Sequence, residues 1–182
     1  MNSIQKLNEF LPLLVSQKLA NERILILSVE TLIFSLNVLK RHIGCRFQML
    51  SCVSGVDLVH EVNRFIVVYD LISLTYNSRI RIKVFVNETT SVMSAVSVYI
   101  NANWWEREIW DMYGVYFDSH PDLRRILTDY GFEGHPLRKD FPISGYVEVK
   151  YDENKKRIVV EPLGLSQDFR LFSFDSPWSI AL

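Results

Sequence analysis

The chain has 182 residues, enough for one domain with its own hydrophobic core, and 48% of them are hydrophobic. Its formal net charge of -1 lacks the basic excess of a nucleic-acid-binding protein, and its apolar content excludes a disordered acidic chain. Residues 1–18 resemble neither a secretory signal nor an Arg-rich presequence. No apolar run reaches the roughly 18 residues of a transmembrane helix.

The cysteine content bounds the cofactor chemistry. Only Cys45 and Cys52 are present, and two widely spaced thiols cannot hold an iron–sulfur cluster or a structural zinc ion alone. Both lie in apolar stretches, where a free cysteine behaves as a small hydrophobic residue. We therefore expect buried free thiols in a reducing compartment, with a disulfide as the lesser alternative.

The start of the chain predicts a helix, a strand and a second helix. Apolar side chains at three- and four-residue spacing favour a helix over residues 4–19, which Pro12 kinks or ends. A short β-branched run over residues 23–29 indicates a strand buried on both faces. The second helix runs from residue 30 or 31 to 42, and Gly44 stops it. Its apolar face consists of Leu32, Leu36 and Leu39 or Lys40.

A two-residue period replaces the helical one in the next part of the chain. The runs over residues 47–53, 60–70 and 78–86 are separated by turn residues at 54–57 and 75–78. These runs predict an antiparallel meander with one buried face. In the last run, cationic and apolar side chains alternate: Arg79, Arg81 and Lys83 with Ile80, Ile82 and Val84.

After a short helix over residues 91–100, the sequence predicts a longer helix that begins at Asn103. Asn103 is a favourable N-cap, and Glu106 stands three residues on, as in a capping box. Gly114 is placed to end the helix in the left-handed conformation.

This helix carries an unusual mixture of rings and charges. Six of the fourteen residues 104–117 are aromatic, and the spacing of Arg107 and Asp111 predicts an ion pair along one side. A helix that is apolar nearly all round must contact protein on several sides, and its charges then need partners. We therefore expect these charges to form ion pairs across a subunit interface: Glu106, Arg107, Glu108 and Asp111.

The rest of the chain is rich in proline and glycine and predicts one regular element. Residues 145–152 and 157–161 alternate around a turn, as in a β-hairpin. Aromatic side chains are spread through this region, where there is little regular structure to bury them. We predict an α/β (α+β) fold with one domain over residues 1–118, whose mixed or mostly antiparallel sheet has helices on one side. An extended, partner-wrapping tail with the hairpin follows over residues 119–182.

The charged helix also begins a longer motif. Two residues separate Glu106-Arg107-Glu108 from Asp111-Met112-Tyr113, and six more precede His120. This arrangement resembles the signature of the 30 kDa subunit family of respiratory-chain NADH dehydrogenase (complex I), including its mitochondrially encoded members. The resemblance covers the whole chain and is most specific from Trp104 onward. The signature and expected subunit-interface residues are Glu106, Arg107, Glu108, Asp111, Met112, Tyr113, Gly114, His120, Pro121, Arg124, Arg125, Ile126 and Leu127.

The resemblance implies a non-catalytic core subunit of the peripheral arm, in the module of NADH:ubiquinone oxidoreductase that reduces quinone. It implies docking on the large subunit that helps to form the quinone pocket. It also implies that this chain binds no cofactor, since FMN and the iron–sulfur clusters belong to neighbouring subunits. The implied location is the matrix side of the mitochondrial inner membrane, or the cytoplasmic side of a bacterial one, without a transmembrane span.

Two other functions remain open from the residues. Glu108 and Asp111 share a helix face and form a candidate acid/base pair for a freestanding hydrolase, but no nucleophile stands near them in sequence. The equivalent subunit of a related membrane-bound hydrogenase shares the helix signature. No glycine-rich phosphate loop is present, so we expect NADH to bind elsewhere.

His120 and His135 are candidate metal ligands, but their spacing fits no standard site, and each His-Pro pair is typical of a turn. The basic residues that follow the helix are candidates for phosphate contacts. We favour pairing with carboxylates, of this chain or of a partner, because an interfacial guanidinium needs a bidentate acceptor. The basic residues are Arg124, Arg125, Arg138 and Lys139, and the acidic candidates are Asp122, Asp129 and Asp140.

Overall fold

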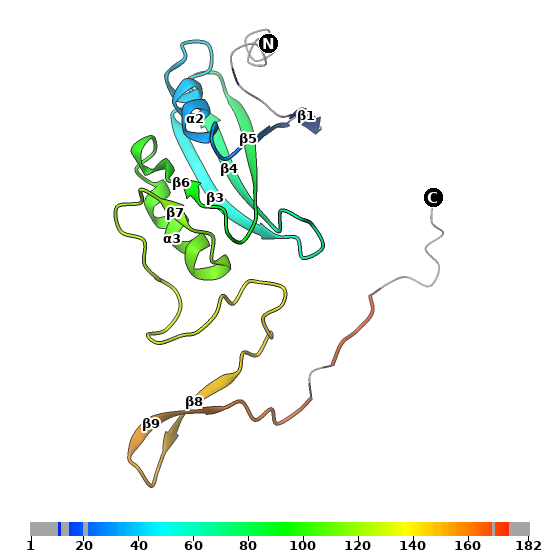
Figure 1. The fold of residues 1–182 in the computed structure, drawn as a ribbon, viewed down its shortest axis with the longest axis vertical. Coiled ribbons are helices and arrows are strands. Elements are labelled where there is room, and N and C mark those ends of the chain that lie inside the picture. Colours follow the sequence, from blue (N-terminus) through cyan, green and yellow to red (C-terminus); the bar gives the residue numbers. More distant parts are fainter. Residues whose placement is uncertain (1–10, 12–14, 20–21, 169, 175–182) are drawn as a thin grey trace. The chain divides into compact units, whose positions relative to one another are not determined.

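The computed structural model describes residues 11, 15–19, 22–168 and 170–174. The chain forms two compact units, the first ending at Phe141 and the second beginning at Pro142 (Figure 1). The sequence predicts an extended tail from residue 119 onward. In the structure, residues 119–141 belong to the first unit, and the contacts that hold them there are described below.

The first unit is built on a five-stranded mixed sheet with the order β1-β2-β5-β4-β3. Strands β2 and β5 run parallel, and the other neighbours are antiparallel. This arrangement confirms the expected mostly antiparallel sheet and its meander from β3 to β5. The strands are β1 (Val15–Leu19), β2 (Glu22–Leu27), β3 (Met49–Asp57), β4 (Phe65–Ser73) and β5 (Ser78–Val86).

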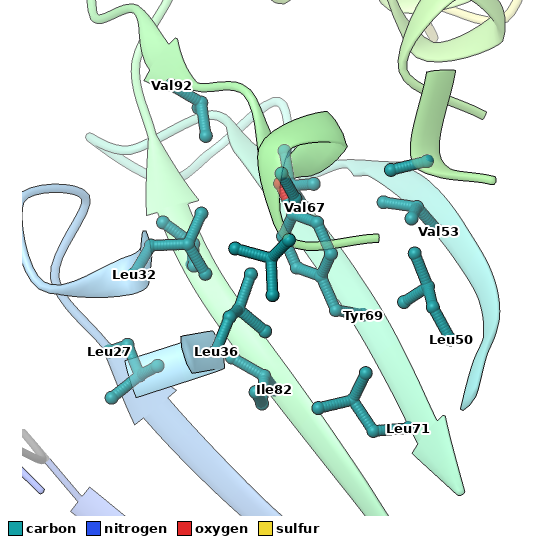
Figure 2. Packing of buried hydrophobic residues seen from close by; sticks show 14 of the residues in the cluster. Leu27, Leu32, Leu36, Leu50, Val53, Val67, Tyr69, Leu71, Ile82 and Val92 are labelled. Carbon is teal, nitrogen blue, oxygen red and sulfur yellow. The ribbon is translucent and has the colours of Figure 1, made fainter. Parts of the chain in front are cut away.

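Helix α2 (Leu32–Arg41) provides the helical side of the core. Leu32, Leu36 and Leu39 are fully buried, as their helical spacing predicts. All three belong to the hydrophobic core, and Leu32 and Leu36 pack toward the apolar face of the sheet, where Tyr69 and Ile82 lie close by (Figure 2). The alternation of β5 places its isoleucines and valines in this core and leaves its basic side chains on the other face.

The remaining elements of the first unit are short, except for one helix. Helix α3 (Ala102–Tyr113) packs against β3 and contributes Ala102 and Ile109 to the core. A 3-10 turn, η1 (Ala95–Ser97), precedes it. Strands β6 (Val92–Met93) and β7 (Phe117–Asp118) pair in parallel on either side of η1 and α3 in the chain.

Several local predictions are wrong in the structure. Residues 15–19 form strand β1 rather than the end of a helix, because they pair along their whole length with β2. The expected helix over residues 4–14 otherwise lies outside the described residues, apart from Leu11. Residues 54–57 continue β3 instead of turning, since each pairs with β4. The expected helix over residues 91–100 is β6 followed by η1.

The second unit contains the predicted hairpin, formed by β8 (Val147–Asp152) and β9 (Arg157–Pro162). Its register puts apolar side chains opposite one another on a single face, because side chains alternate along each strand. The opposite face carries charges, including an ion pair between Lys150 and Glu161. Each named side chain of the apolar face is more than half exposed: Val147, Val149, Tyr151, Ile158 and Val160.

Candidate functional site

Helix α3 carries the charged half of the signature, and its N-terminus differs from the predicted one. The helix begins at Ala102, and Asn101 occupies the N-cap position without a side-chain cap bond. The Asn101 amide instead donates to the carbonyl of Leu50 on β3, at 2.7 Å. Asn103 therefore lies inside the helix, and the capping box with Glu106 does not form.

Glu106 is fully buried and holds η1 in place. Its Oε2 accepts a hydrogen bond from the Ser94 hydroxyl at 2.6 Å, and its Oε1 accepts one from the backbone N–H of Ala95 at 2.7 Å. Burial raises the pKa of the Glu106 carboxyl from 4.5 to about 7, against the lowering effect of these two bonds. This carboxylate is used inside the chain and is not available to a partner.

Asp111, also fully buried, organises the segment that follows the helix. Its two oxygens accept five hydrogen bonds of 2.7 to 3.1 Å. Burial alone would raise the pKa of Asp111, but the hydrogen bonds outweigh it and lower the pKa to about 2. Asp111 therefore does not form the predicted i,i+4 ion pair with Arg107, and its hydrogen-bond donors lie 14 to 17 positions further along the chain. The donors are the backbone N–H groups of Ile126, Leu127 and Thr128, the Thr128 hydroxyl and the Arg125 guanidinium.

The C-terminus of α3 is closed by residues far along the chain. Gly114 ends the helix in the left-handed conformation, with φ 79°, as predicted. His135 Nδ1 donates to the carbonyl of Asp111, and Arg138 Nε donates to the carbonyl of Tyr113 at 2.6 Å. The backbone N–H of Leu137 donates to the Met112 carbonyl between them. Three helix carbonyls that lack partners within α3 are thus satisfied by residues 135–138.

A second set of contacts ties the end of this segment to the sheet. The Arg64 guanidinium forms two hydrogen bonds with Asp57, at 2.7 and 3.0 Å, and an ion pair with Asp140 at 3.0 Å. Asp57 also accepts the backbone N–H of Lys139 at 2.7 Å. The hydrogen bond from Arg64 is the largest cause that lowers the pKa of Asp57. Neither Arg64 nor Asp57 stands out in the sequence, because Asp57 lies 82 positions before Lys139 and Arg64 is similarly distant from Asp140.

His120 is a structural residue in this arrangement. Its Nδ1 accepts the backbone N–H of Asp122, so the ring proton resides on Nε2, which faces the Asn103 carbonyl at 3.2 Å. Glu106 Oε2 lies 3.8 Å from the same nitrogen, and both side chains are fully buried. Among the described residues, no group of three or more His, Cys, Asp or Glu side chains is placed to hold a metal ion.

Arg107 differs from the other charges of the motif. Its side chain is 6% exposed, its Nε lacks a hydrogen-bond acceptor, and it forms no ion pair within the described part of the chain. Its guanidinium carbon lies 5.4 Å from the centre of the Trp104 ring. A cation–π contact contributes about 0.5 to 2 kcal/mol, and it leaves the buried Nε–H of Arg107 without an acceptor.

The remaining signature residues divide between core and surface. Met112 is buried, and the Tyr113 ring lies against Gly55, where an added Cβ would approach it to 2.7 Å. Gly55 was expected in a turn, and the contact with Tyr113 explains the glycine within β3. Arg124 pairs with Asp122 at 3.0 Å on the surface, as predicted. The other four are Glu108 and Ile126, which are half-buried, and Pro121 and Leu127, which are exposed.

The acid/base interpretation of Glu108 and Asp111 finds no support in this geometry. Asp111 is saturated with donors, and a pKa of about 2 makes it a weak base at neutral pH.

Among the described residues, no helix is long and apolar enough to cross a membrane.

Comparison with known proteins identifies the family. The family described as the respiratory-chain NADH dehydrogenase, 30 Kd subunit, matches residues 25–147. The NADH-ubiquinone oxidoreductase subunit 9 of Reclinomonas americana is 56% identical over 147 residues, which cover 81% of this chain and 72% of that protein. The NADH dehydrogenase [ubiquinone] iron-sulfur protein 3 of Beta trigyna is 60% identical over 140 residues, or 77% of this chain and 73% of that protein. The protein of that name from Arabidopsis thaliana is 59% identical over the same length, which covers 74% of it. The chain belongs to the 30 kDa subunit family of the respiratory-chain NADH dehydrogenase.

Two of these relatives are named iron-sulfur proteins, but the cysteines of this chain do not suit cluster binding. Cys45 is buried and lies 3.5 Å from His42 Nδ1, and the Cys52 thiol donates to Asp70 at 3.6 Å. Both are free, and burial is the main cause that raises the pKa of each thiol, which disfavours the thiolate that binds metal. A cluster held by four thiolates does not fit a chain with two cysteines.

Proposed function

We propose that this chain is a non-catalytic docking subunit of NADH:ubiquinone oxidoreductase. It serves the complex that transfers electrons from NADH to ubiquinone by holding the large subunit of the peripheral arm that helps to form the quinone pocket. It binds no flavin, iron–sulfur cluster or metal of its own. It works on the matrix side of the mitochondrial inner membrane.

One observation supports this proposal above the others: the apolar face of the β8–β9 hairpin is open. A two-stranded hairpin is only marginally stable in water, and an apolar patch on one of its faces favours burial against another surface. Val149 and Val160 face each other across the strands, and each is at least 60% exposed. The charged opposite face suits the water side of such a contact.

The signature residues support a scaffolding role, because most of them hold the chain's own segments together. Glu106 anchors η1, and Asp111 anchors residues 126–128. Catalytic carboxylates need an open route to a substrate, whereas these two are fully buried. Their chemistry is used to fix a surface for partners.

The test compares two matched substitutions on β9 in the assembled enzyme. V160D puts a charge on the apolar face, and V159D puts the same charge on the opposite face, where its cross-strand neighbour is Lys150. Burial of an unpaired carboxylate costs several kcal/mol, so V160D should lower the amount of assembled complex at least about tenfold. V159D should leave assembly near wild type.

Native gels stained for NADH oxidation measure both variants. If V160D assembles as well as V159D, the hairpin is not a docking surface. If V160D assembles normally but the complex turns over more slowly, the chain contributes to the reaction and the scaffold proposal is wrong.

A further inference from the structure

Arg107 has no hydrogen-bond or ion-pair partner among the described residues, although it is more than nine-tenths buried. The guanidinium group offers five N–H donors, and Nε is both buried and without an acceptor. Arg107 lies on α3 between Glu106 and Asp111, and both of these carboxylates have hydrogen-bond donors within the chain. Of the three, only Arg107 is left without an acceptor by the fold of the described residues.

Three candidate carboxylates for Arg107 within the chain are already engaged. Asp111 accepts five hydrogen bonds from residues 125–128, and Glu106 accepts two from η1 and the residue before it. Asp122, whose pKa Arg107 helps to lower, forms its hydrogen bond with Arg124 at 3.0 Å instead. A new acceptor for Arg107 must therefore come from outside this set.

The surface beside Arg107 has the composition of a protein contact. The Trp104 ring, which lies against the guanidinium, is 58% exposed, and Ile100, four positions earlier, is 84% exposed. Tryptophan and arginine are the residues most enriched among those that dominate binding energy at protein interfaces. A partner that covers Trp104 would also remove the remaining water from Arg107.

We propose that Arg107 binds one aspartate or glutamate side chain of a neighbouring subunit, held against the Trp104 ring. This inference rests on the proposed function and names the chemistry of one of its contacts. A planar guanidinium binds a carboxylate through two parallel hydrogen bonds, which fixes the orientation of the partner as well as its charge. A lipid or nucleic-acid phosphate surface fits less well, because such surfaces recruit clusters of basic residues, and Arg124 nearby is paired.

The first test identifies the acceptor by chemistry. R107K keeps a positive charge and introduces an amine that a carbodiimide couples to a carboxylate in direct contact. In the assembled enzyme, mass spectrometry should find a bond from position 107 to an acidic residue of another subunit. A bond to any carboxylate of this chain, or none at all in an assembled R107K complex, overturns the inference.

The second test does not depend on assembly of the lysine variant. R107M removes the buried charge and keeps an unbranched apolar side chain of similar reach. The purified R107M chain should have a Tm equal to or above that of wild type, because an unpaired buried charge is lost. The amount of assembled complex should nevertheless fall at least about tenfold. A lower Tm of the purified chain would show that Arg107 has an internal role, and normal assembly would show that it has no docking role.

D122N is the control for pairing within the chain. If Arg107 acted by pairing with Asp122, D122N would reproduce the loss of assembly seen with R107M. We expect D122N to assemble normally. Failure of this inference is distinguishable from failure of the proposed function, because V160D reports on the hairpin independently of Arg107: a defective V160D with a normal R107M overturns only the arginine anchor.

Discussion

Residues 119–141 and residues 142–168 look alike in sequence and differ in structure. Both stretches are irregular outside the hairpin and contain proline, glycine and aromatic side chains. The first stretch is fixed to α3 and the sheet by Asp111, His135, Arg138 and Arg64, and it completes the core unit. The second forms a hairpin with an open apolar face. Composition alone therefore does not separate a segment that completes its own domain from one that we propose is completed by a neighbour.

The largest effect should follow removal of the Asp111 carboxylate. D111A leaves three backbone N–H groups and a guanidinium without their acceptor, and loss of one partner from a buried charged network costs about 3 to 5 kcal/mol. Chemical denaturation of the purified chain should show this loss of stability, and limited proteolysis should cut near residues 124–134. The exposed D122A serves as the control and should change stability by about 0.5 kcal/mol or less. A loss below about 1 kcal/mol for D111A would mean that the segment is held by other contacts.

Glu106 should make the stability of the same unit depend on pH in the opposite sense to Asp111. Its pKa is about 7 in the folded chain and 4.5 without the fold, so the folded state holds the extra proton between these values. Stability should therefore fall as the pH rises from about 4.5 to 7, by roughly 3 kcal/mol at most, and level off above that.

E106Q should remove this dependence. Its amide can still accept from Ala95 and donate to Ser94, but it does not ionise. Denaturation curves between pH 5 and 8 measure both proteins, with E106Q equal to wild type at the acidic end and more stable at the basic end. An equally steep slope in E106Q would assign the pH effect to another group.

Substitution of Gly114, at the C-terminus of α3, should have a smaller effect on the free energy of unfolding. G114A adds a Cβ within 2.6 Å of His135 Nε2 and 2.7 Å of Arg138 Nη2, at a residue with positive φ. We expect a loss of about 2 kcal/mol in the free energy of unfolding. The exposed glycine Gly131 also has a positive φ but open space around it. G131A should therefore lose only the stability that a positive φ costs a residue with a Cβ. Equal losses in the two variants would show that contact with residues 135–138 does not matter.

The smallest effect on the purified chain should follow complete removal of the second unit. A chain that ends at Phe141 keeps the contacts that Asp111, Arg64 and the C-terminus of α3 make with residues 119–141, so its free energy of unfolding should change by less than about 0.5 kcal/mol. The same truncation should abolish incorporation into the enzyme, which native gels detect. A large loss of stability would show that the second unit supports the first.

The sequence predicted those parts of the molecule that depend on local periodicity. The alternation of β5, the leucine face of α2, Gly114 at the end of α3 and the C-terminal hairpin all follow from side chains a few positions apart. Residues 15–19 were mistaken for helix because short apolar runs fit either period, and their pairing with β2 decides the outcome.

The site was less predictable, because its contacts join distant residues. Nothing near Asp111 in the sequence indicates that its donors lie at residues 125–128, and the nearby Arg107 was the more obvious partner. His135 and Arg138 were noted for possible metal and phosphate contacts, whereas both close a helix. The sequence located the important residues but not their partners.

Hydrogen exchange, measured on the purified chain and on the assembled enzyme, tests the central contrast most directly. The backbone N–H groups of residues 126–128 should exchange slowly in both, because Asp111 binds them within the chain. The N–H groups that pair across β8 and β9 should exchange rapidly in the purified chain and slowly in the enzyme. A hairpin that is equally protected in both samples would contradict the account.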